Sequence, residues 1–540
     1  MTENSLPQSS PTWWRGAAIY QIYPRSFADS NGDGIGDLPG ITARLPHVAS
    51  LGVDAIWLSP FFKSPMRDFG YDVSDYCDVD PIFGTLADFD ALVKRAHDLN
   101  LRVIIDQVWA HTSDAHRWFV ESRASRDNPL ADWYVWADPK ADGSPPNNWQ
   151  SVFGGPAWTW DARRGQYYMH QFLAQQPQLH LHNPQVQQAV FDIIRFWLDR
   201  GVDGFRIDAI NHAMHDPLLR DNPPAPDDGR TRTRPFDFQI RKYNQSHPDI
   251  PLFLEKVRQV FDGYPDRFTV AEVGGDDSDG EMKAFTAGDH RLNTAYGFDF
   301  LYAPDLTPEL IKDALVKWPE DSGTRPGTGW PSWAFENHDA PRAVSRWAKG
   351  NDADAFCRMK MLLLACLRGN IFLYQGEELG LPQVDIAFED LQDPEAIANW
   401  PLTLSRDGAR TPMPWAAAAP YLGFSNAKPW LPVGETHRAL AVDVQEQASA
   451  SLLHWTRRVL ALRNGSPALR IGSIAFLNAP EPLLAFTRTA GEERLLCVFN
   501  LGEAARAWRP TDAADCTPLL SAGDVAAWHF PAASALVARG

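Results

Sequence analysis

Eight short runs of apolar and β-branched residues recur along the chain, and polar residues directly follow each run. The runs show little alternation between apolar and polar positions, which is typical of parallel strands that are buried on both faces. They occupy residues 18–23, 53–60, 101–108, 202–208, 267–273, 295–302, 333–339 and 370–378.

Helical patterns lie between these runs, and residues 183–200 carry the clearest one. Asn183 can cap this helix, Pro184 suits its first turn, and Gly201 stands where the helix should stop. The apolar positions recur at helical spacing: Val186, Ala189, Val190, Ile193, Trp197 and Leu198. Alternation of helix and strand, with eight strands, predicts an α/β fold of the (β/α)8 TIM barrel type.

Three stretches do not fit this repeat. Residues 112–182 are rich in Trp, Pro, Gly and Asn and predict a small inserted domain after the third strand. The segment DNPPAPDDGRTRTRP, after the fourth strand, predicts a long polar loop. Short alternating strands such as PLLAFTRT and RLLCVFNL follow near the end of the chain. We therefore expect a barrel over residues 1–111 and 183–464, an inserted domain B over 112–182, and a C-terminal antiparallel β domain over 465–540.

The composition narrows the class of protein. Of the 540 residues, 44% are hydrophobic and 22% are charged, as in an ordinary globular protein. The net charge of -18 argues against nucleic acid and anionic membrane partners. Five cysteines without a CxxC pair predict reduced thiols rather than a disulfide frame. No signal-like apolar run opens the chain, so we expect a cytoplasmic monomer or homodimer, or a periplasmic form whose signal has been removed.

Chemically capable side chains stand where four of the predicted strands end. They are Asp106 and His111 after the third strand, Arg206 and Asp208 at the end of the fourth, Glu272 at the end of the fifth, and His338 and Asp339 at the end of the seventh. The carboxyl ends of barrel strands meet at one face. A single carboxylate there is as easily a helix cap, but several carboxylates with an arginine and two histidines predict a catalytic site.

These groups suit the cleavage of a glycosidic bond, in which one carboxylate attacks the anomeric carbon and one carboxylic acid protonates the leaving oxygen. Arg206 precedes Asp208 by two residues and so shares its strand face, where its charge favours an ionised Asp208. Glu272 follows apolar residues whose burial would keep it protonated. Asp339, like His111 and His338, could then bind sugar hydroxyls.

Longer motifs resemble a known family. DQVWAH, GFRIDAI, VAEV and FENHD resemble the four conserved regions of the α-amylase superfamily, glycoside hydrolase family 13. YQIYPRSFADSNGDGIGDLPGI and DFGYDVSDY resemble its α-glucosidase and oligo-1,6-glucosidase branch, and RTPMPW and QGEELG add to the match. The resemblance runs from about residue 13 to the end of the chain.

The resemblance implies a retaining double displacement with Asp208 as nucleophile, Glu272 as acid/base and Asp339 as stabiliser of the transition state. It also implies a pocket for one non-reducing glucose, closed by an ion pair between Arg410 and Asp68, and therefore exo action on short α-glucosides. The further residues that it places around the substrate are Tyr71, His111, Phe153, Gln176, Arg206 and His338.

Two positions depart from the pattern of the branch. The family motif QPDLN is QPQLH here, so that Gln178 replaces an aspartate that usually supports the contact with the inserted domain. Ala209 follows the proposed nucleophile, where valine accompanies α-1,6 specificity in this branch and smaller residues accompany α-1,4 specificity. The second departure implies a preference for α-1,4 links.

Residues 29–37 predict a structural metal site. The side-chain oxygens of Asp29, Asn31, Asp33 and Asp37 and the carbonyl of Ile35 fall at positions 1, 3, 5, 9 and 7 of a loop similar to an EF-hand, although position 12 is not glutamate. The loop resembles the Ca2+ loop of the branch, and Mg2+ is the alternative. A plain turn of Asp, Asn and Gly is the simpler interpretation.

Two alternative functions remain open at this point. A trehalose synthase, a sucrose hydrolase or a glucosyl-transferring α-glucosidase would share nearly all these residues. The loop at residues 222–234 could shift the balance between hydrolysis and transfer. Transporter-associated homologues that lack catalysis form a different class. They carry a membrane helix and usually lack part of the catalytic set, whereas all three carboxylates are present here.

Overall fold

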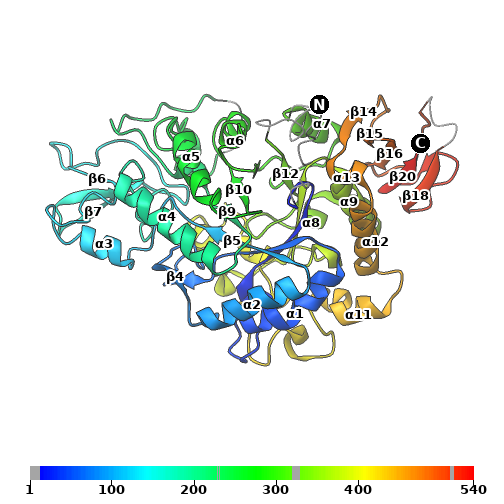
Figure 1. Cartoon of the computed structure of the whole chain (residues 1–540), viewed down its shortest axis with the longest axis horizontal. Helices are drawn as coiled ribbons and strands as arrows, with labels where there is room; N and C mark the ends of the chain where they lie inside the picture. The colour runs from blue at the N-terminus through cyan, green and yellow to red at the C-terminus, as the bar shows by residue number, and fades with distance from the viewer. Residues whose placement is uncertain (1–12, 228, 230–231, 319–328, 511–515) are drawn as a thin grey trace, which may run out of the picture.

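Eight parallel strands form the centre of the molecule (Figure 1). The computed structural model describes residues 13–227, 229, 232–318, 329–510 and 516–540. The sheet order is β11-β10-β9-β5-β2-β1-β13-β12, and a parallel bridge between Ala295 and Pro331 joins its two ends. The strands are β1 (Ala18–Ile22), β2 (Ala55–Leu58), β5 (Arg102–Gln107), β9 (Gly204–Ile207), β10 (Phe268–Glu272), β11 (Thr294–Tyr296), β12 (Ser332–Ala334) and β13 (Asn370–Tyr374).

All eight apolar runs contain a barrel strand, which confirms the predicted (β/α)8 fold. Two strands overlap only the first two residues of their runs, because the chain leaves the sheet after Tyr296 and after Ala334. Beyond Ala334 the polar side chain of Glu336 turns into a buried ion pair with Lys360, 2.8 Å away, instead of continuing the strand.

Helices on the outside connect the strands (Figure 1). The longer ones are α1 (Leu38–Ser50), α2 (Leu86–Asp98), α4 (Pro184–Asp199), α5 (Ile250–Phe261), α6 (Ser278–Thr286), α7 (Pro308–Val316), α9 (Ala353–Cys366) and α12 (Leu452–Asn464). The shorter ones are α3 (Arg117–Ser122), α8 (Ala343–Trp347), α10 (Pro394–Ala398), α11 (Val442–Gln447) and α13 (Pro467–Ile471). Helix α4 begins as predicted, with the Asn183 side chain accepting a hydrogen bond from the Gln185 amide.

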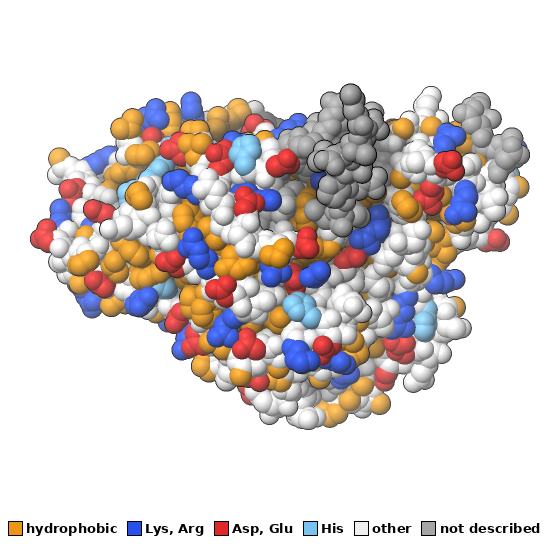
Figure 2. Space-filling view, viewed as in Figure 1, with side chains coloured by type: hydrophobic (Ala, Val, Ile, Leu, Met, Phe, Trp, Pro, Cys, Tyr) orange, Lys and Arg blue, Asp and Glu red, His pale blue; other side chains and the backbone are white. Residues whose placement is uncertain are grey.

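Short 3-10 helices occur in the loops, and two of them carry residues of the site described below. They are η1 (Pro24–Ser26), η2 (Ile210–His212), η3 (Pro235–Phe238), η4 (Glu377–Leu379), η5 (Phe388–Asp390), η6 (Arg406–Ala409), η7 (Pro420–Gly423) and η8 (Glu435–Leu440). No helix among the described residues is long and apolar enough to cross a membrane. On the face drawn in Figure 2, acidic and basic side chains are interspersed, and the basic ones do not gather into one area.

The segment between β5 and α4 forms a small layer of its own at the left of Figure 1. Its antiparallel strands are β6 (Trp136–Ala137), β8 (Gln166–Met169) and β7 (Trp158–Asp161), in that order, and buried Trp149 and Trp158 pack in its core. The Gln178 amide donates to the carbonyl of His212, 2.7 Å away. This amide therefore fixes the inserted segment to the barrel by donating, where the aspartate of the family motif could only accept.

Two further sheets complete the fold. Strands β3 (Phe62–Lys63) and β4 (Asp75–Val79) pair beside the barrel. The C-terminal sheet is antiparallel, in the order β14 (Ser473–Phe476), β15 (Leu483–Ala490), β16 (Glu493–Asn500), β20 (Ser534–Arg539) and β18 (Thr517–Ala522), with β17 (Arg506–Ala507) and β19 (His529–Phe530) paired separately. This sheet confirms the predicted C-terminal β domain.

Two buried arginines join the C-terminal part to the barrel. Arg488 on β15 donates to the carbonyl of Cys366, 2.6 Å away. Arg463 on α12 donates to the carbonyl oxygens of Gly16, at 3.0 Å, and of Gly369, at 2.6 Å. Because Gly16 precedes β1 and Gly369 precedes β13, this one side chain holds the first and last barrel strands together.

A buried ion-pair network holds the segment that follows β12. Lys360 lies 2.8 Å from Glu336 and 2.9 Å from Glu377, and Arg342 lies 3.2 Å from Glu336. The side chains of Lys360 and both glutamates are 2% exposed or less. Since Glu336 begins the segment that ends at Asp339, this network positions one of the predicted catalytic carboxylates.

We expect Lys360→Met to lower the free energy of unfolding by about 3–5 kcal/mol, because it leaves two carboxylates buried without their shared cation. Denaturant unfolding measures the change. The matched control is Lys94→Met on α2, where the pair with Asp98 is exposed and the expected loss is below about 0.5 kcal/mol. Equal effects of the two substitutions would contradict a positioning network.

Candidate active site

A cavity of about 610 Å³ opens at the carboxyl ends of the barrel strands. Asp208, directly after β9, Glu272, the last residue of β10, and Asp339, which follows β12, all line it. The walls also include residues of the inserted segment and of the loop at residues 402–406. Parallel strands place their carboxyl ends at one face, which explains why residues more than a hundred positions apart meet here.

Arg206 is the centre of the buried charges below this cavity. Its Nη1 atom lies 2.8 Å from Asp106 and 2.7 Å from Asp208, and its Nη2 atom lies 2.5 Å from Glu272. The guanidinium stacks 4.9 Å from the Trp57 ring and is fully buried. One cation therefore serves three carboxylates.

The shared cation leaves two of these carboxylates with pKa values near neutrality. Burial raises the pKa of Asp208 and of Glu272 to about 7 each, although Arg206 opposes the rise in both cases. Burial also raises the pKa of Asp106 to about 6. Arg206 thus lowers the pKa of Asp208, as the sequence suggested, but burial outweighs it. For Glu272 the upward direction agrees with the expectation from its apolar strand.

Asp339 is in the opposite electrostatic situation. Burial alone would raise its pKa, but His338, Arg410 and Arg406 hold the pKa of this carboxyl well below its usual range. Arg410 lies 2.7 Å and Arg406 3.3 Å from the same carboxylate oxygen. Asp339 therefore stays ionised at the near-neutral pH values at which Asp208 and Glu272 gain or lose a proton.

The tautomer of His338 follows from its neighbours. The Gln21 amide nitrogen, which can only donate, lies 2.8 Å from Nδ1 of His338. Burial lowers the pKa of this histidine to about 3, so that the ring is neutral and carries its proton on Nε2. Nε2 lies 2.6 Å from the Tyr71 hydroxyl and 3.2 Å from Asp339. The ring is thus fixed from both sides and contacts Asp339 directly.

The prediction of an ion pair between Arg410 and Asp68 is wrong. Arg406, not Arg410, lies 3.3 Å from Asp68, and it also lies 2.7 Å from Asp393. Arg410 stacks under the Tyr23 ring and donates to the His338 carbonyl at 2.7 Å, which directs it to Asp339 instead. Arg406 was not predicted, although it lies four residues before Arg410 in the same stretch, SRDGAR.

The remaining predicted residues lie around Asp68. Gln176 donates to Asp68 at 3.1 Å, and its amide nitrogen is also 3.1 Å from Nε2 of His111. His111 lies 3.0 Å from the Tyr71 carbonyl. Phe153 lies below the Arg406 guanidinium, with 5.2 Å between them. The structure thus brings together every residue that the sequence predicted for the substrate and the catalytic step.

Other residues at this cavity were not predicted. Tyr296 ends β11 and donates to Glu272 at 3.1 Å, while Arg206 donates to the Tyr296 hydroxyl at 3.1 Å. Tyr296 is the second residue of the sixth apolar run, so a rule that considers only the end of each run misses it. Phe298 and Tyr302, later in the same run, also line the cavity, as do Phe172, Phe236 and Arg241 from connecting segments.

The residues predicted to hold a metal form a tightly bonded loop. Asp29 accepts from the amides of Asn31 at 3.0 Å and Gly34 at 2.8 Å, and Asp33 accepts from the Ile35 amide at 2.8 Å. Asp37 caps α1 by accepting from the Gly40 amide at 2.6 Å. The donor set consists of oxygen atoms alone, which fits a hard cation such as Ca2+ or Mg2+.

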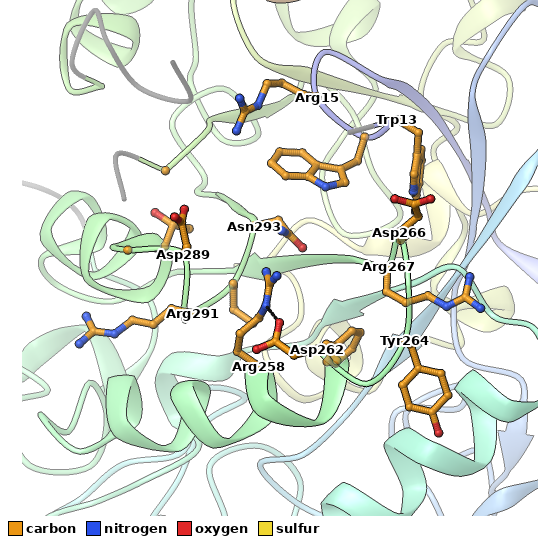
Figure 3. A pocket seen from close by; sticks show the side chains of 16 residues that line it. Trp13, Arg15, Arg258, Asp262, Tyr264, Asp266, Arg267, Asp289, Arg291 and Asn293 are labelled. Atoms are coloured by element: carbon orange, nitrogen blue, oxygen red, sulfur yellow. Dashed lines mark hydrogen bonds and ion pairs between the residues drawn. The ribbon is translucent and has the colours of Figure 1, made fainter. Parts of the chain in front are cut away.

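A second cavity, of about 410 Å³, lies at the opposite end of the barrel (Figure 3). Its lining includes Asp266 and Arg267, directly before β10, and Asn293, directly before β11. Figure 3 shows Arg258 paired with Asp262 there, at 2.7 Å. This cavity faces the amino ends of the strands, where barrels carry stabilising rather than catalytic residues.

Comparisons with known proteins agree with this geometry. The model of the α-amylase catalytic domain matches residues 21–472. The chain is 53% identical over 511 residues to a probable α-glucosidase of Rhizobium meliloti (strain 1021), covering 93% of this chain and 92% of that protein. It is 36% identical over 531 residues to the oligo-1,6-glucosidase of Parageobacillus thermoglucosidasius, with 93% and 92% covered. The crystal structure of the α-glucosyl transfer enzyme XgtA matches with a TM-score of 0.93 at 50% identity, covering 98% of this chain and 100% of that one.

We expect Arg406→Met to lower the free energy of unfolding at pH 7 by about 3 kcal/mol, because Asp68 and Asp393 lose a buried partner. Arg406 helps to lower the pKa values of Asp339 and Asp393, so its contribution is present above the unfolded aspartate pKa of about 3.9 and is lost as the pH falls below it. Urea unfolding at pH 7 and pH 3 should therefore show a smaller difference from wild type at pH 3.

The matched control for this substitution is Arg234→Met. Arg234 pairs with Asp237 and Glu395 at 3.0 Å each, but its side chain is 27% exposed. We expect a loss of about 1 kcal/mol or less there. The role of Arg406 as a buried cation would be wrong if both variants lost the same stability.

Proposed function

Because the chain belongs to the α-amylase family, we propose that it is a retaining α-glucosidase that removes single glucose residues from the non-reducing end of short α-glucosides. The chain is a glycoside hydrolase of the α-glucosidase kind, with an oligosaccharide as substrate. The proposal adds the stereochemistry, the exo action, an α-1,4 preference, and glucosyl transfer to alcohol acceptors.

One observation carries the proposed mechanism: a single cavity holds two carboxyl groups with a pKa of about 7 beside one carboxylate that stays ionised. In the ionised form Asp208 attacks the anomeric carbon, and protonated Glu272 gives its proton to the departing glycosidic oxygen. The products of this step are a glucosyl ester on Asp208, a free sugar and an ionised Glu272.

The second step reverses these roles. Ionised Glu272 takes a proton from water, the water oxygen attacks the anomeric carbon, and the ester bond to Asp208 breaks. Glucose leaves with its original anomeric configuration, and both carboxyl groups return to their first states. An alcohol in place of the water gives a glucoside instead of free glucose, so hydrolysis and transfer share the same intermediate.

The polar part of the cavity wall around Asp68 supports exo action. Asp68 and Arg406 meet there, and Gln176 donates to Asp68. Burial raises the pKa of Asp68 to about 6, against the effect of Arg406 and Arg410. Such a wall offers charged hydrogen-bond partners to the outer hydroxyls of one terminal glucose and ends the space for a longer chain.

Ala209 supports the α-1,4 preference. It lines the cavity directly after Asp208, with a φ of 39° and its amide 3.4 Å from Glu272. A valine in this left-handed conformation would be strained, because branching at Cβ crowds the backbone there. The relative with 53% identity is named a probable α-glucosidase, whereas the oligo-1,6-glucosidase is 36% identical.

Glucosyl transfer is supported by the likeness to XgtA, which is named for that reaction. Residues of the loop predicted to bias transfer over hydrolysis also lie at the cavity, namely Thr233 and Arg234, and Phe236 and Asp237 follow them. Residues 228, 230 and 231 of that loop lie outside the described residues.

The metal and the cellular location are further parts of the proposal. We propose that Asp29, Asn31, Asp33, Asp37 and the Ile35 carbonyl hold a structural Ca2+, with Mg2+ as the alternative, distant from the reacting groups. A cytoplasmic location is supported by the five free cysteines, three of which are buried. The partner is a neutral sugar, and a monomer and a homodimer are both compatible with the structure.

A product time course on maltose, isomaltose, sucrose and trehalose tests the activity, with NMR following the anomer of released glucose. We expect α-glucose to appear first, maltose to be cleaved faster than isomaltose, and new glucosides to form at high sugar concentration. Release of β-glucose would exclude the double displacement. Faster cleavage of sucrose, or conversion of trehalose to maltose, would favour a sucrose hydrolase or a trehalose synthase.

Asp208→Asn should lower turnover by about 10⁴-fold or more, because the substituted amide cannot form the glucosyl ester. The matched control is Asp237→Asn on the cavity rim, which should stay within about tenfold of the wild type. Circular dichroism should show that both variants are folded. Activity of Asp208→Asn close to that of the control would remove Asp208 from the mechanism.

Tyr296→Phe should move the alkaline limb of the kcat/KM profile to higher pH. The Tyr296 hydroxyl stabilises ionised Glu272, so its loss raises the pKa of Glu272 above about 7, and this residue stays a proton donor to higher pH. A hydrogen bond of about 1 kcal/mol corresponds to about 0.7 pH units. In Tyr302→Phe, which loses only a bond to the Asp339 carbonyl, the limb should not move. A shift to lower pH in Tyr296→Phe would contradict the assignment of Glu272.

Chelation tests the metal loop. EDTA should lower the melting temperature of the wild type by a few degrees, and added Ca2+ should restore it, because a cation bound only by the folded state stabilises that state. Asp33→Asn should reduce this response. The control Asp142→Asn, in an exposed turn closed on Ser144, should keep the full response. The loop would be a plain turn if EDTA changed nothing in the wild type.

A further inference from the structure

Four histidine rings meet where the inserted segment returns to the barrel. His182 lies 4.9 Å from His247 and 5.5 Å from His215, measured between ring centroids, and His180 lies 5.9 Å from His215. They come from three parts of the chain: the end of the inserted segment, the loop after β9, and the turn before α5. None of them lines the catalytic cavity.

Asp249 adds a carboxylate to this cluster. Its Oδ2 atom lies 3.9 Å from Nδ1 of His182 and 3.7 Å from Nδ1 of His247. One ligand atom from each of these three residues lies within 4.8 Å of the other two. Among the described residues this is the only group of three or more histidine, cysteine or acidic side chains with that spacing.

The hydrogen bonds prepare both histidines to act as ligands. Nε2 of His182 lies 2.8 Å from the His215 carbonyl, which can only accept, so Nε2 carries the proton and Nδ1 is bare. The Asp249 amide donates to Nδ1 of His247 at 3.2 Å, so this nitrogen is also unprotonated and faces Asp249. A histidine anchored on a backbone carbonyl with its other nitrogen free is the usual arrangement around a protein-bound metal.

We propose that His182, His247 and Asp249 bind a divalent transition-metal cation, with Zn2+ as the reference ion. Two imidazoles and a carboxylate suit Zn2+, whereas Ca2+ and Mg2+ prefer oxygen atoms alone. Ligand atoms around tetrahedral Zn2+ lie about 3.3 Å apart. The two pairs that include Asp249, at 3.7 and 3.9 Å, therefore have to close by about half an ångström. The two histidine ligand atoms, which lie within 4.8 Å of each other, have to close by at most about 1.5 Å.

The site is accessible and has room for a fourth ligand. The side chains of His182 and His247 are 17% and 18% exposed, and that of Asp249 is 52% exposed. A cation can therefore enter from solvent and keep a water molecule in its open position. The long bond from the Asp249 amide to His247 is the single contact that coordination by Nδ1 would replace.

Metal binding here would join three elements that the fold otherwise holds by separate contacts. His182 belongs to the inserted segment, and the His215 carbonyl that accepts its hydrogen bond lies in the loop after β9. Asp249 directly precedes α5 (Ile250–Phe261). The cation thus acts as a cross-link between the inserted segment and the barrel. Because it binds the folded arrangement alone, it stabilises that arrangement.

Isothermal titration with Zn2+ tests the site, on untagged full-length protein freed of metal and kept in excess Ca2+ and Mg2+, so that oxygen-ligand sites are filled. We expect one Zn2+ per chain and a rise in melting temperature of about 1–3 °C at saturation. His247→Ala and Asp249→Asn should each weaken the binding at least tenfold and remove the thermal shift. Asp249→Asn keeps the size of the side chain and so changes the fold least.

The matched control is His454→Ala, because His454 on α12 also stands beside a carboxylate, 3.9 Å from Glu446, but belongs to no group with metal-ligand spacing among the described residues. We expect its Zn2+ binding to equal that of the wild type. Circular dichroism without metal should show that all three variants are folded. The proposal is overturned if the wild type shows no saturable binding, or if His247→Ala and Asp249→Asn bind Zn2+ as tightly as the control.

Discussion

The active site depends on one positive charge that three buried carboxylates share. Arg206 contacts Asp106, Asp208 and Glu272 at 2.5–2.8 Å, and no other cation among the described residues lies as close to any of the three. Burying three negative charges against one positive charge is unfavourable, and the cluster lowers this cost by holding protons near neutral pH. Protons held beside a nucleophile are what acid/base chemistry requires. Because these three carboxylates share a single arginine, Asp208 and Glu272 have pKa values near neutrality, which the proposed reaction uses.

The other side of the cavity has a different ratio of charges. There Arg406 and Arg410 face Asp68, Asp339 and Asp393, and His338 adds a polar contact. Two cations suffice to keep Asp339 ionised, although burial alone would protonate it. Asp339 therefore differs in protonation from Asp208 and Glu272 because it faces two arginines, whereas they share one.

The sequence predicted those features that follow from strand periodicity. The eight apolar runs located the barrel strands, and residues at their ends, such as Asp208 and Glu272, had to meet because parallel strands share a carboxyl face. Contacts made by loops were beyond such reasoning. The choice of Arg406 over Arg410 as partner of Asp68 depends on how η6 is placed, and the histidine cluster joins segments more than thirty residues apart. No spacing rule covers either arrangement, and the motif resemblance located the site residues but gave Asp68 the wrong arginine as its partner.

The position of Arg463 has a consequence for biosynthesis. Its guanidinium binds the carbonyl oxygens that precede both β1 and β13, so the seam between the first and last strands is complete only when α12 is present. A nascent chain that has exposed all eight strands at the ribosome still lacks this residue by about ninety positions. The emerging barrel therefore gains this link late, and chaperones that cover apolar strand edges would act during that interval.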